Sequence, residues 1–151
     1  PRCRWRRHPA QETDQTTGGQ FAHHEQRAHP VIDLIGRPYR YGADGTDPDG
    51  ALDCIHLVYI VLGRLGINTP PFDQDWYVAS RIAIGRDLLQ WGRRVTGANY
   101  DGDVALLAGE EPIFAVAWQN GLLYINRPLE QVAWCPIGIV PKCRCFRTKN
   151  N

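Results

Sequence analysis

Residues 53–66 read DCIHLVYIVLGRLG and decide the fold of this 151-residue chain. Asp53 is a good N-cap residue, apolar residues fill most of the run, and either of its glycines can end it, so we predict a helix. Cys54 then lies in the first turn, where free backbone N–H groups and the positive end of the helix dipole stabilise a thiolate. The residue is therefore a candidate nucleophile, although most free cysteines are small buried hydrophobes.

A tyrosine-rich loop precedes this helix. Residues 35–42 read IGRPYRYG, and this Pro-Tyr-x-Tyr-Gly pattern followed by Asp-Cys resembles the nucleophile region of NlpC/P60 cysteine peptidases. Those enzymes cut the peptide stems of bacterial cell walls. The resemblance implies that Cys54 is the nucleophile and that Tyr39 lies beside it. It also implies that Asp53 and Tyr41 lie near the bound substrate.

The resemblance continues, more weakly, in the second half of the chain. Residues 100–107 (YDGDVALL) resemble the Gly-Asp-hydrophobic strand of the family, and residues 112–121 (PIFAVAWQNG) resemble the strand and hairpin that begin with the catalytic histidine. Ile113 or Phe114 stands at the histidine position, and neither side chain can accept a proton. No histidine follows His56, so the resemblance implies the fold of a peptidase without its usual general base.

The remaining polar positions do not restore that base. Asn126 falls near the third polar residue of the family triad, with a register uncertain by one residue. His56 is two residues from Cys54, about 200° around a helix, so we expect the two side chains to point apart. Without a base, a thiol of ordinary pKa is only a few per cent thiolate at pH 7. The other histidines lie before the domain or at its first residue and would have to fold back: His8, His23, His24 and His29.

Composition and patterning give the organisation of the chain. Residues 1–28 form a polar, basic arm, and residues 29–151 form a single NlpC/P60-like domain with a cysteine-rich C-terminal strand region. A net charge of +1 argues against a dedicated nucleic-acid binder, and no apolar run reaches membrane-spanning length. We therefore expect neither a nucleic-acid partner nor a membrane span.

Helical patterns come first and strand patterns follow. We predict helices over residues 22–35, 53–66 and 80–95, and short strands from Val104 onward, separated by turns at Gly109, Asn120-Gly121 and Arg127-Pro128. This order predicts an α+β domain with helices packed on an antiparallel sheet, and the resemblance implies the papain-like version of that class. Four tryptophans could line a groove, but we interpret them as core or interface residues: Trp76, Trp91, Trp118 and Trp134.

The cysteines other than Cys54 suggest a second site. Three of them lie near the end of the chain as Cys-x7-Cys-x-Cys, and one lies in the basic arm. Gathered thiolates can hold Zn²⁺ or an iron–sulfur cluster, although this spacing is no standard zinc motif. Free thiols are the leading alternative, and disulfides are another. The candidate metal ligands are Cys3, Cys135, Cys143 and Cys145.

Three segments resemble one branch of the family. Residues 50–54 (GALDC), 65–67 (LGI) and 103–107 (DVALL) resemble tail-associated versions found in phages and prophages. The resemblance implies a structural hub or adaptor of a tail tip or baseplate, assembled in the host cytoplasm and located in the virion. Its partners would be other tail proteins, reached through the arm and the C-terminal tail, and peptidoglycan. The alternatives are an active peptidoglycan endopeptidase carried on the tail and a bacterial effector or scavenging hydrolase outside any phage.

Overall fold

The structure is a computed structural model that describes residues 31–71, 74–108, 113–139 and 143–149. The basic arm and most of the helix predicted over residues 22–35 lie outside these residues. The end of that predicted helix is a 3-10 turn, η1 (Ile32–Leu34). None of the helices in the described ranges is long and apolar enough to cross a membrane.

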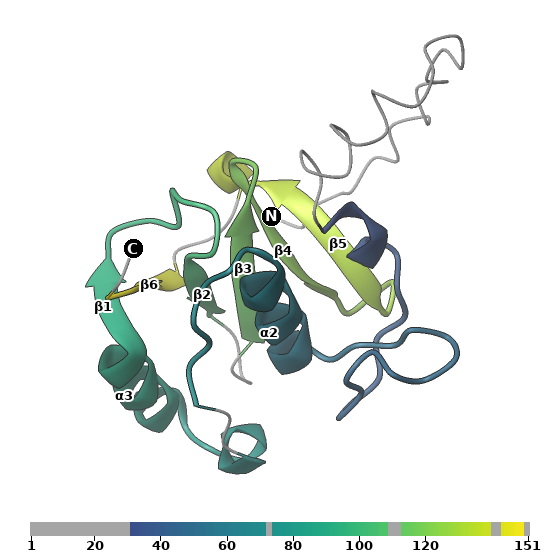
Figure 1. The fold of residues 1–151 in the computed structure, drawn as a ribbon, viewed down its shortest axis with the longest axis horizontal. Helices are drawn as coiled ribbons and strands as arrows, with labels where there is room; N and C mark the ends of the chain where they lie inside the picture. Colours follow the sequence, from purple (N-terminus) through teal and green to yellow (C-terminus); the bar gives the residue numbers. More distant parts are fainter. Residues whose placement is uncertain (1–30, 72–73, 109–112, 140–142, 150–151) are drawn as a thin grey trace, which may run out of the picture.

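A six-stranded antiparallel sheet forms the centre of the molecule (Figure 1). Its strands run in the spatial order β1-β6-β2-β3-β4-β5, so the last strand of the chain lies between the first two. The prediction of an α+β domain with an antiparallel sheet is confirmed at this level. The strands are β1 (Gly92–Val95), β2 (Val104–Leu107), β3 (Ile113–Trp118), β4 (Gly121–Asn126), β5 (Gln131–Pro136) and β6 (Cys143–Thr148).

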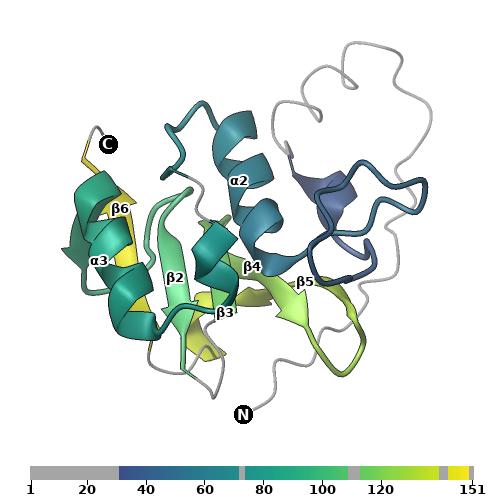
Figure 2. The same cartoon turned by 90° about the horizontal axis from the view of Figure 1, so that it is seen from below.

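The predicted helix at the candidate nucleophile is α2 (Cys54–Arg64). As predicted, Asp53 caps it: the Asp53 Oδ1 atom accepts a hydrogen bond from the His56 backbone N–H at 2.8 Å. The helix packs on β3 and β4 and crosses one face of the sheet (Figure 2). The first turn of α2, which carries Cys54, is thereby held against the sheet.

The helix predicted over residues 80–95 is shorter than expected. Helix α3 (Arg81–Trp91) begins after the N-cap Ser80 and ends at Trp91, and the next four residues form strand β1. A Cβ atom on Gly92 would lie 2.3 Å from the Arg147 carbonyl oxygen of β6. The close backbone approach that this glycine permits, together with pairing to β6, overrides the helical pattern of the sequence.

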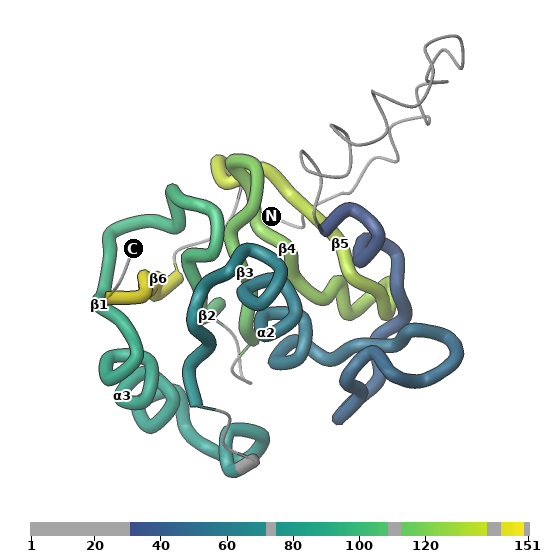
Figure 3. The backbone as a smooth tube through the Cα atoms, in the orientation of Figure 1, coloured from purple at the N-terminus to yellow at the C-terminus, as the bar shows by residue number. Residues whose placement is uncertain are grey.

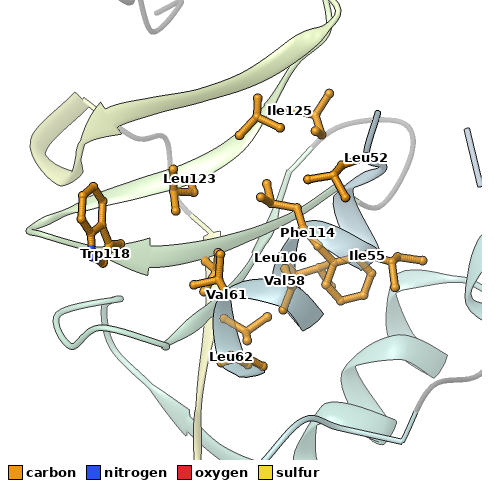
Figure 4. Close-up of a cluster of buried hydrophobic side chains, with 14 of the residues drawn as sticks. Leu52, Ile55, Val58, Val61, Leu62, Leu106, Phe114, Trp118, Leu123 and Ile125 are labelled. Atoms are coloured by element: carbon orange, nitrogen blue, oxygen red, sulfur yellow. The ribbon is translucent and has the colours of Figure 1, made fainter. Parts of the chain in front are cut away.

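Alternation along the strands gives the sheet two different faces. The face toward α2 carries the large side chains, and Figure 4 shows Phe114 of β3 beside Ile55 and Val58 of α2. The opposite face, here called the alanine face, carries Ala105, Ala115, Ala117, Leu122 and Cys145. Trp76 and Trp118 are buried in the core on the α2 side, and Trp91 and Trp134 pack against it. The interpretation of the tryptophans as core residues is confirmed.

The tyrosine-rich loop is fixed to the edge strand β5. The Gly36 N–H donates to the Val132 carbonyl oxygen at 2.9 Å, and the Tyr39 N–H donates to the Glu130 carbonyl oxygen at 2.8 Å. Figure 3 shows this part of the backbone passing beside β5 before it turns toward α2. Sheet edge, loop and helix start therefore meet in one place, which is where the candidate site lies.

Candidate functional site

Cys54 is the first residue of α2 and is half-buried beside the start of β3. Burial raises the pKa of the Cys54 thiol, and the charge of Asp53 raises it further. A backbone hydrogen bond from Phe114 and the charge of Arg127 lower that pKa, but by less. At this position burial therefore has the largest effect, and it favours the protonated thiol over the thiolate that we expect from the helix N-terminus.

Phe114 occupies the place where the resemblance predicts a histidine. Its side chain points toward α2, is 2 % exposed and stacks on Trp76, with ring centroids 5.3 Å apart. Its neighbour Ile113 is half-buried and lies on the opposite side of the strand. The strand position therefore offers Cys54 a backbone amide, and its side chain is an aromatic hydrocarbon without a titratable group.

His56 is the only histidine among the described residues, and it turns back toward Asp53. Its Nδ1 atom lies 2.8 Å from the Asp53 Oδ1 atom and 3.4 Å from the Tyr77 hydroxyl. The Tyr77 hydroxyl donates a hydrogen bond to the other oxygen of the buried Asp53. Burial and this bond raise the pKa of Tyr77. Asp53 thus orients an imidazole and a phenol.

The tyrosines of the predicted site lie near this group. The Tyr39 hydroxyl accepts a hydrogen bond from Arg127 Nη1 at 2.9 Å, and the guanidinium lies 4.6 Å from the centroid of the Tyr39 ring. Tyr41 is exposed, and its ring centroid is 5.0 Å from that of Tyr77. The structure therefore places Asp53, Tyr39 and Tyr41 around the start of α2. Their roles beside a nucleophile and a substrate stay predictions.

Sequence reasoning missed Tyr77 and Arg127. Tyr77 comes from η2 (Gln74–Tyr77), twenty-one residues after His56, and no local pattern links the two. Arg127 follows β4 directly and belongs to a predicted turn. An aspartate at the N-cap with a histidine three residues later is the one local signal that could have indicated the Asp53–His56 pair, since those positions face each other in a first helical turn.

Asn126 does not join this group. It ends β4, where Leu123 and Ile125 take the α2 side, so alternation places Asn126 on the alanine face. Its Oδ1 atom accepts a hydrogen bond from the Leu129 N–H at 3.2 Å. The side chain thus caps the turn between β4 and β5, and the predicted role as a third catalytic residue finds no support in this placement.

The predicted metal ligands are not gathered either. Cys135 lies on β5, whereas Cys143 and Cys145 lie on β6, and three strands separate β5 from β6. At about 4.8 Å per strand this is a separation of about 19 Å, too far for one metal centre. Across the described residues no group of three or more metal-ligating side chains occurs. Cys3 lies outside those residues, and no disulfide joins the four cysteines within them.

Cys143 and Cys145 nevertheless form a close pair, with their Sγ atoms 3.4 Å apart.

No protein-family model matches this sequence, and no curated protein is significantly similar to it. Two groups of side chains therefore carry the chemistry of this chain. One is the group around Cys54 and His56 on the α2 side of the sheet, and the other is the thiol pair on the alanine face.

Proposed function

We propose that this chain is an NlpC/P60-like domain of papain-like fold that has lost Cys-His peptidase chemistry and acts as a structural hub or adaptor of a phage tail tip or baseplate. The observation that carries the loss of chemistry is Phe114, which stands on the sheet opposite Cys54 where a general base is needed. The tail context is supported by the sequence resemblance of the segments around Cys54.

The chemical argument for inactivity has two parts. A cysteine peptidase needs a base that takes the thiol proton and an acid that returns a proton to the leaving amine. The Phe114 side chain can do neither. The raised pKa of Cys54 also keeps the thiol protonated at neutral pH, so the nucleophile is weak even before the missing acid is considered.

The surroundings of Cys54 still offer features that suit a peptide ligand. Arg127 supplies a positive charge beside Tyr39, and Tyr41 presents an exposed ring next to Tyr77. Stem peptides of bacterial cell walls carry carboxylates, which an arginine binds well. We therefore propose peptidoglycan binding without cleavage as a secondary property of this adaptor.

Cleavage of purified muropeptides tests the proposal directly. The intact chain and Cys54→Ala, compared at matched concentration, should show the same absence of cleavage. Phe114→His is the positive control, because it places an imidazole at the strand position that the family uses for its histidine. We expect this variant to raise the rate of Cys54 alkylation at pH 7. Cysteine-dependent cleavage by the unmodified chain would overturn the proposal.

One observation favours the active endopeptidase as a second candidate. The Asp53–His56 pair is a carboxylate-oriented imidazole in the same helical turn as Cys54, and a carboxylate that orients the imidazole is one part of a catalytic triad. If this pair serves Cys54, both His56→Ala and Cys54→Ala abolish muropeptide cleavage while thermal unfolding stays nearly unchanged. Our proposal predicts no cleavage for either variant or for the intact chain.

The structural role has its own test. A tagged copy of the chain should co-sediment with purified phage tails and resist a high-salt wash, because a hub is held by extensive interfaces. Recovery only as a free monomer, with both termini cleaved readily by protease, would refute the adaptor role and leave the question of peptidase activity untouched.

A further inference from the structure

The alanine face carries a feature that the proposed function does not use. Strand β1 pairs with β6 only from Cys145 to Thr148, so Cys143 and Arg144 extend beyond the end of β1. An open pocket of about 640 Å³ lies at this extension. Its lining includes Cys143 and Cys145 together with three arginines, Arg81, Arg94 and Arg144.

Strand register shows how these groups surround the pocket. Cys143 and Cys145 lie opposite Leu107 and Ala105 of β2, on the alanine face. Arg144 alternates to the other face, where its guanidinium approaches Gly85 of α3. The pocket therefore straddles the edge of β6, with thiols on one side and arginines on the other.

The two thiols are unequal and coupled. A hydrogen bond between their sulfur atoms lowers the pKa of Cys143 to about 7 and raises the pKa of Cys145. Cys143 is half-buried and Cys145 is buried, so Cys143 is the thiol that a substrate in the pocket reaches first. Asp103 also raises the pKa of Cys145, which strengthens this division. Such a pair has the form of an attacking thiol and a resolving thiol.

We propose that Cys143 and Cys145 form a redox-active dithiol that reduces small anionic disulfides bound in the arginine-lined pocket. The positive charge of three arginines selects disulfides that carry carboxylates. The thiol pair lies on the face of the sheet opposite Cys54, so the proposal stands independently of the peptidase question.

The reaction balances with the disulfide as oxidant. The Cys143 thiolate attacks one sulfur of the substrate, the substrate S–S bond breaks, and the first thiolate leaves and takes up a proton. The Cys145 thiol then loses its proton and attacks the Cys143 sulfur, which forms the Cys143–Cys145 disulfide and releases the second thiol. The protein dithiol is oxidised by two electrons, and one disulfide becomes two thiols.

The backbone allows this product. Residues two apart on a strand have Cα atoms about 6.6 Å apart, within the upper part of the range that a disulfide spans. The two sulfur atoms already lie 3.4 Å apart, so bond formation needs only side-chain rotation and a slight local adjustment.

Oxidised glutathione is the probe for the test, with the intact chain under anaerobic conditions. Intact mass and peptide mapping should show a Cys143–Cys145 disulfide and two released thiols per chain. Cys145→Ala should stop at a glutathione mixed disulfide on Cys143, because the resolving thiol is gone. Cys135→Ser, which changes another buried thiol of the sheet, should react like the unmodified chain.

The arginine pocket is tested by charge reversal. Arg94→Glu should slow the reaction with oxidised glutathione about tenfold, and should leave the reaction with the neutral hydroxyethyl disulfide nearly unchanged. Arg93→Glu is the matched control, since Arg93 is the exposed neighbour on β1 that does not line the pocket. Equal rates for the anionic and neutral disulfides, or an unmodified chain that forms no Cys143–Cys145 disulfide with oxidised glutathione, would overturn the proposal.

Discussion

Removal of the Arg147 side chain should be among the most damaging single changes to this fold. Arg147 donates two hydrogen bonds to Asp103, from Nε to Oδ1 and from Nη2 to Oδ2, both at 2.8 Å. The Asp103 side chain is 0 % exposed and the Arg147 side chain 14 %. The guanidinium also lies 4.0 Å from the centroid of the Tyr100 ring. The pair ties β6 to the start of β2, next to Cys145.

The magnitude follows from the burial of the aspartate. Arg147→Ala leaves the Asp103 carboxylate in the protein interior without its positive partner, and such a change costs about 3–5 kcal/mol of unfolding free energy. For a chain of this size, that loss lowers the melting temperature by roughly 6–20 °C. Asp103→Ala should cost less, because the longer Arg147 side chain can reach water when its partner is gone.

Chemical denaturation of both single variants and the double variant measures the coupling between the two residues. The control is Arg64→Ala, because Arg64 also pairs with an aspartate, Asp33, at 3.1 Å, but with side chains 34 % and 52 % exposed. That exposed pair should contribute at most about 1 kcal/mol. If Arg147→Ala loses no more stability than Arg64→Ala, the argument from burial is refuted.

Three further predictions concern single positions. Gly121→Ala would place a Cβ atom 2.4 Å from the Cys135 carbonyl oxygen. Urea denaturation should therefore show that the unfolding free energy falls by about 1–3 kcal/mol. The control is Gly63→Ala in α2, where a Cβ atom meets nothing within 4 Å, so this variant should be as stable as the unmodified chain or more stable. Cys143 has a pKa of about 7. Its alkylation rate should therefore rise only about tenfold from pH 6 to pH 8, whereas the rate of an ordinary thiol rises roughly ninetyfold. Peptide mapping measures this rate at Cys143, and a ninetyfold rise would contradict the prediction. Asp53→Ala should remove about 1 kcal/mol by loss of the N-cap, and Asp53→Asn, which keeps a capping oxygen, should lose less in the same thermal melt.

Features fixed by local chemistry were predictable from the sequence. The capping aspartate and the apolar run predict a helix over residues 53–66, and α2 ends two residues earlier, at Arg64. The turn signal at Asn120-Gly121 marked the hairpin between β3 and β4, although the turn residues with positive φ are Gln119 and Asn120 (52° and 59°), one residue earlier than predicted. Such signals act through the backbone preferences of a few neighbouring residues, so they can be read without tertiary structure.

Features that depend on strand order were not predictable in the same way. Cys135 and Cys143 are close in sequence, yet the chain crosses from one side of the sheet to insert β6 between β1 and β2. The proposed four-cysteine metal site failed for that reason, and only the pair of cysteines on one strand remained together. The local pattern predicts that residues 92–95 end a helix, whereas they form β1. The pairing of β1 with β6 is a long-range interaction, so it leaves no local pattern in the sequence.

The two obstacles to thiol chemistry at Cys54 reinforce each other. In a Cys-His site the imidazolium compensates the thiolate for the loss of water, so a buried thiol can still ionise. Phe114 supplies no such charge, and burial raises the pKa of the Cys54 thiol. A helix N-terminus offers at most about half a unit of positive charge. Burial and the charge of Asp53 together leave the pKa of Cys54 above its ordinary value. A simple gain of exposure at Cys54 would therefore not restore catalysis, whereas an imidazole at position 114 addresses both the proton and the charge.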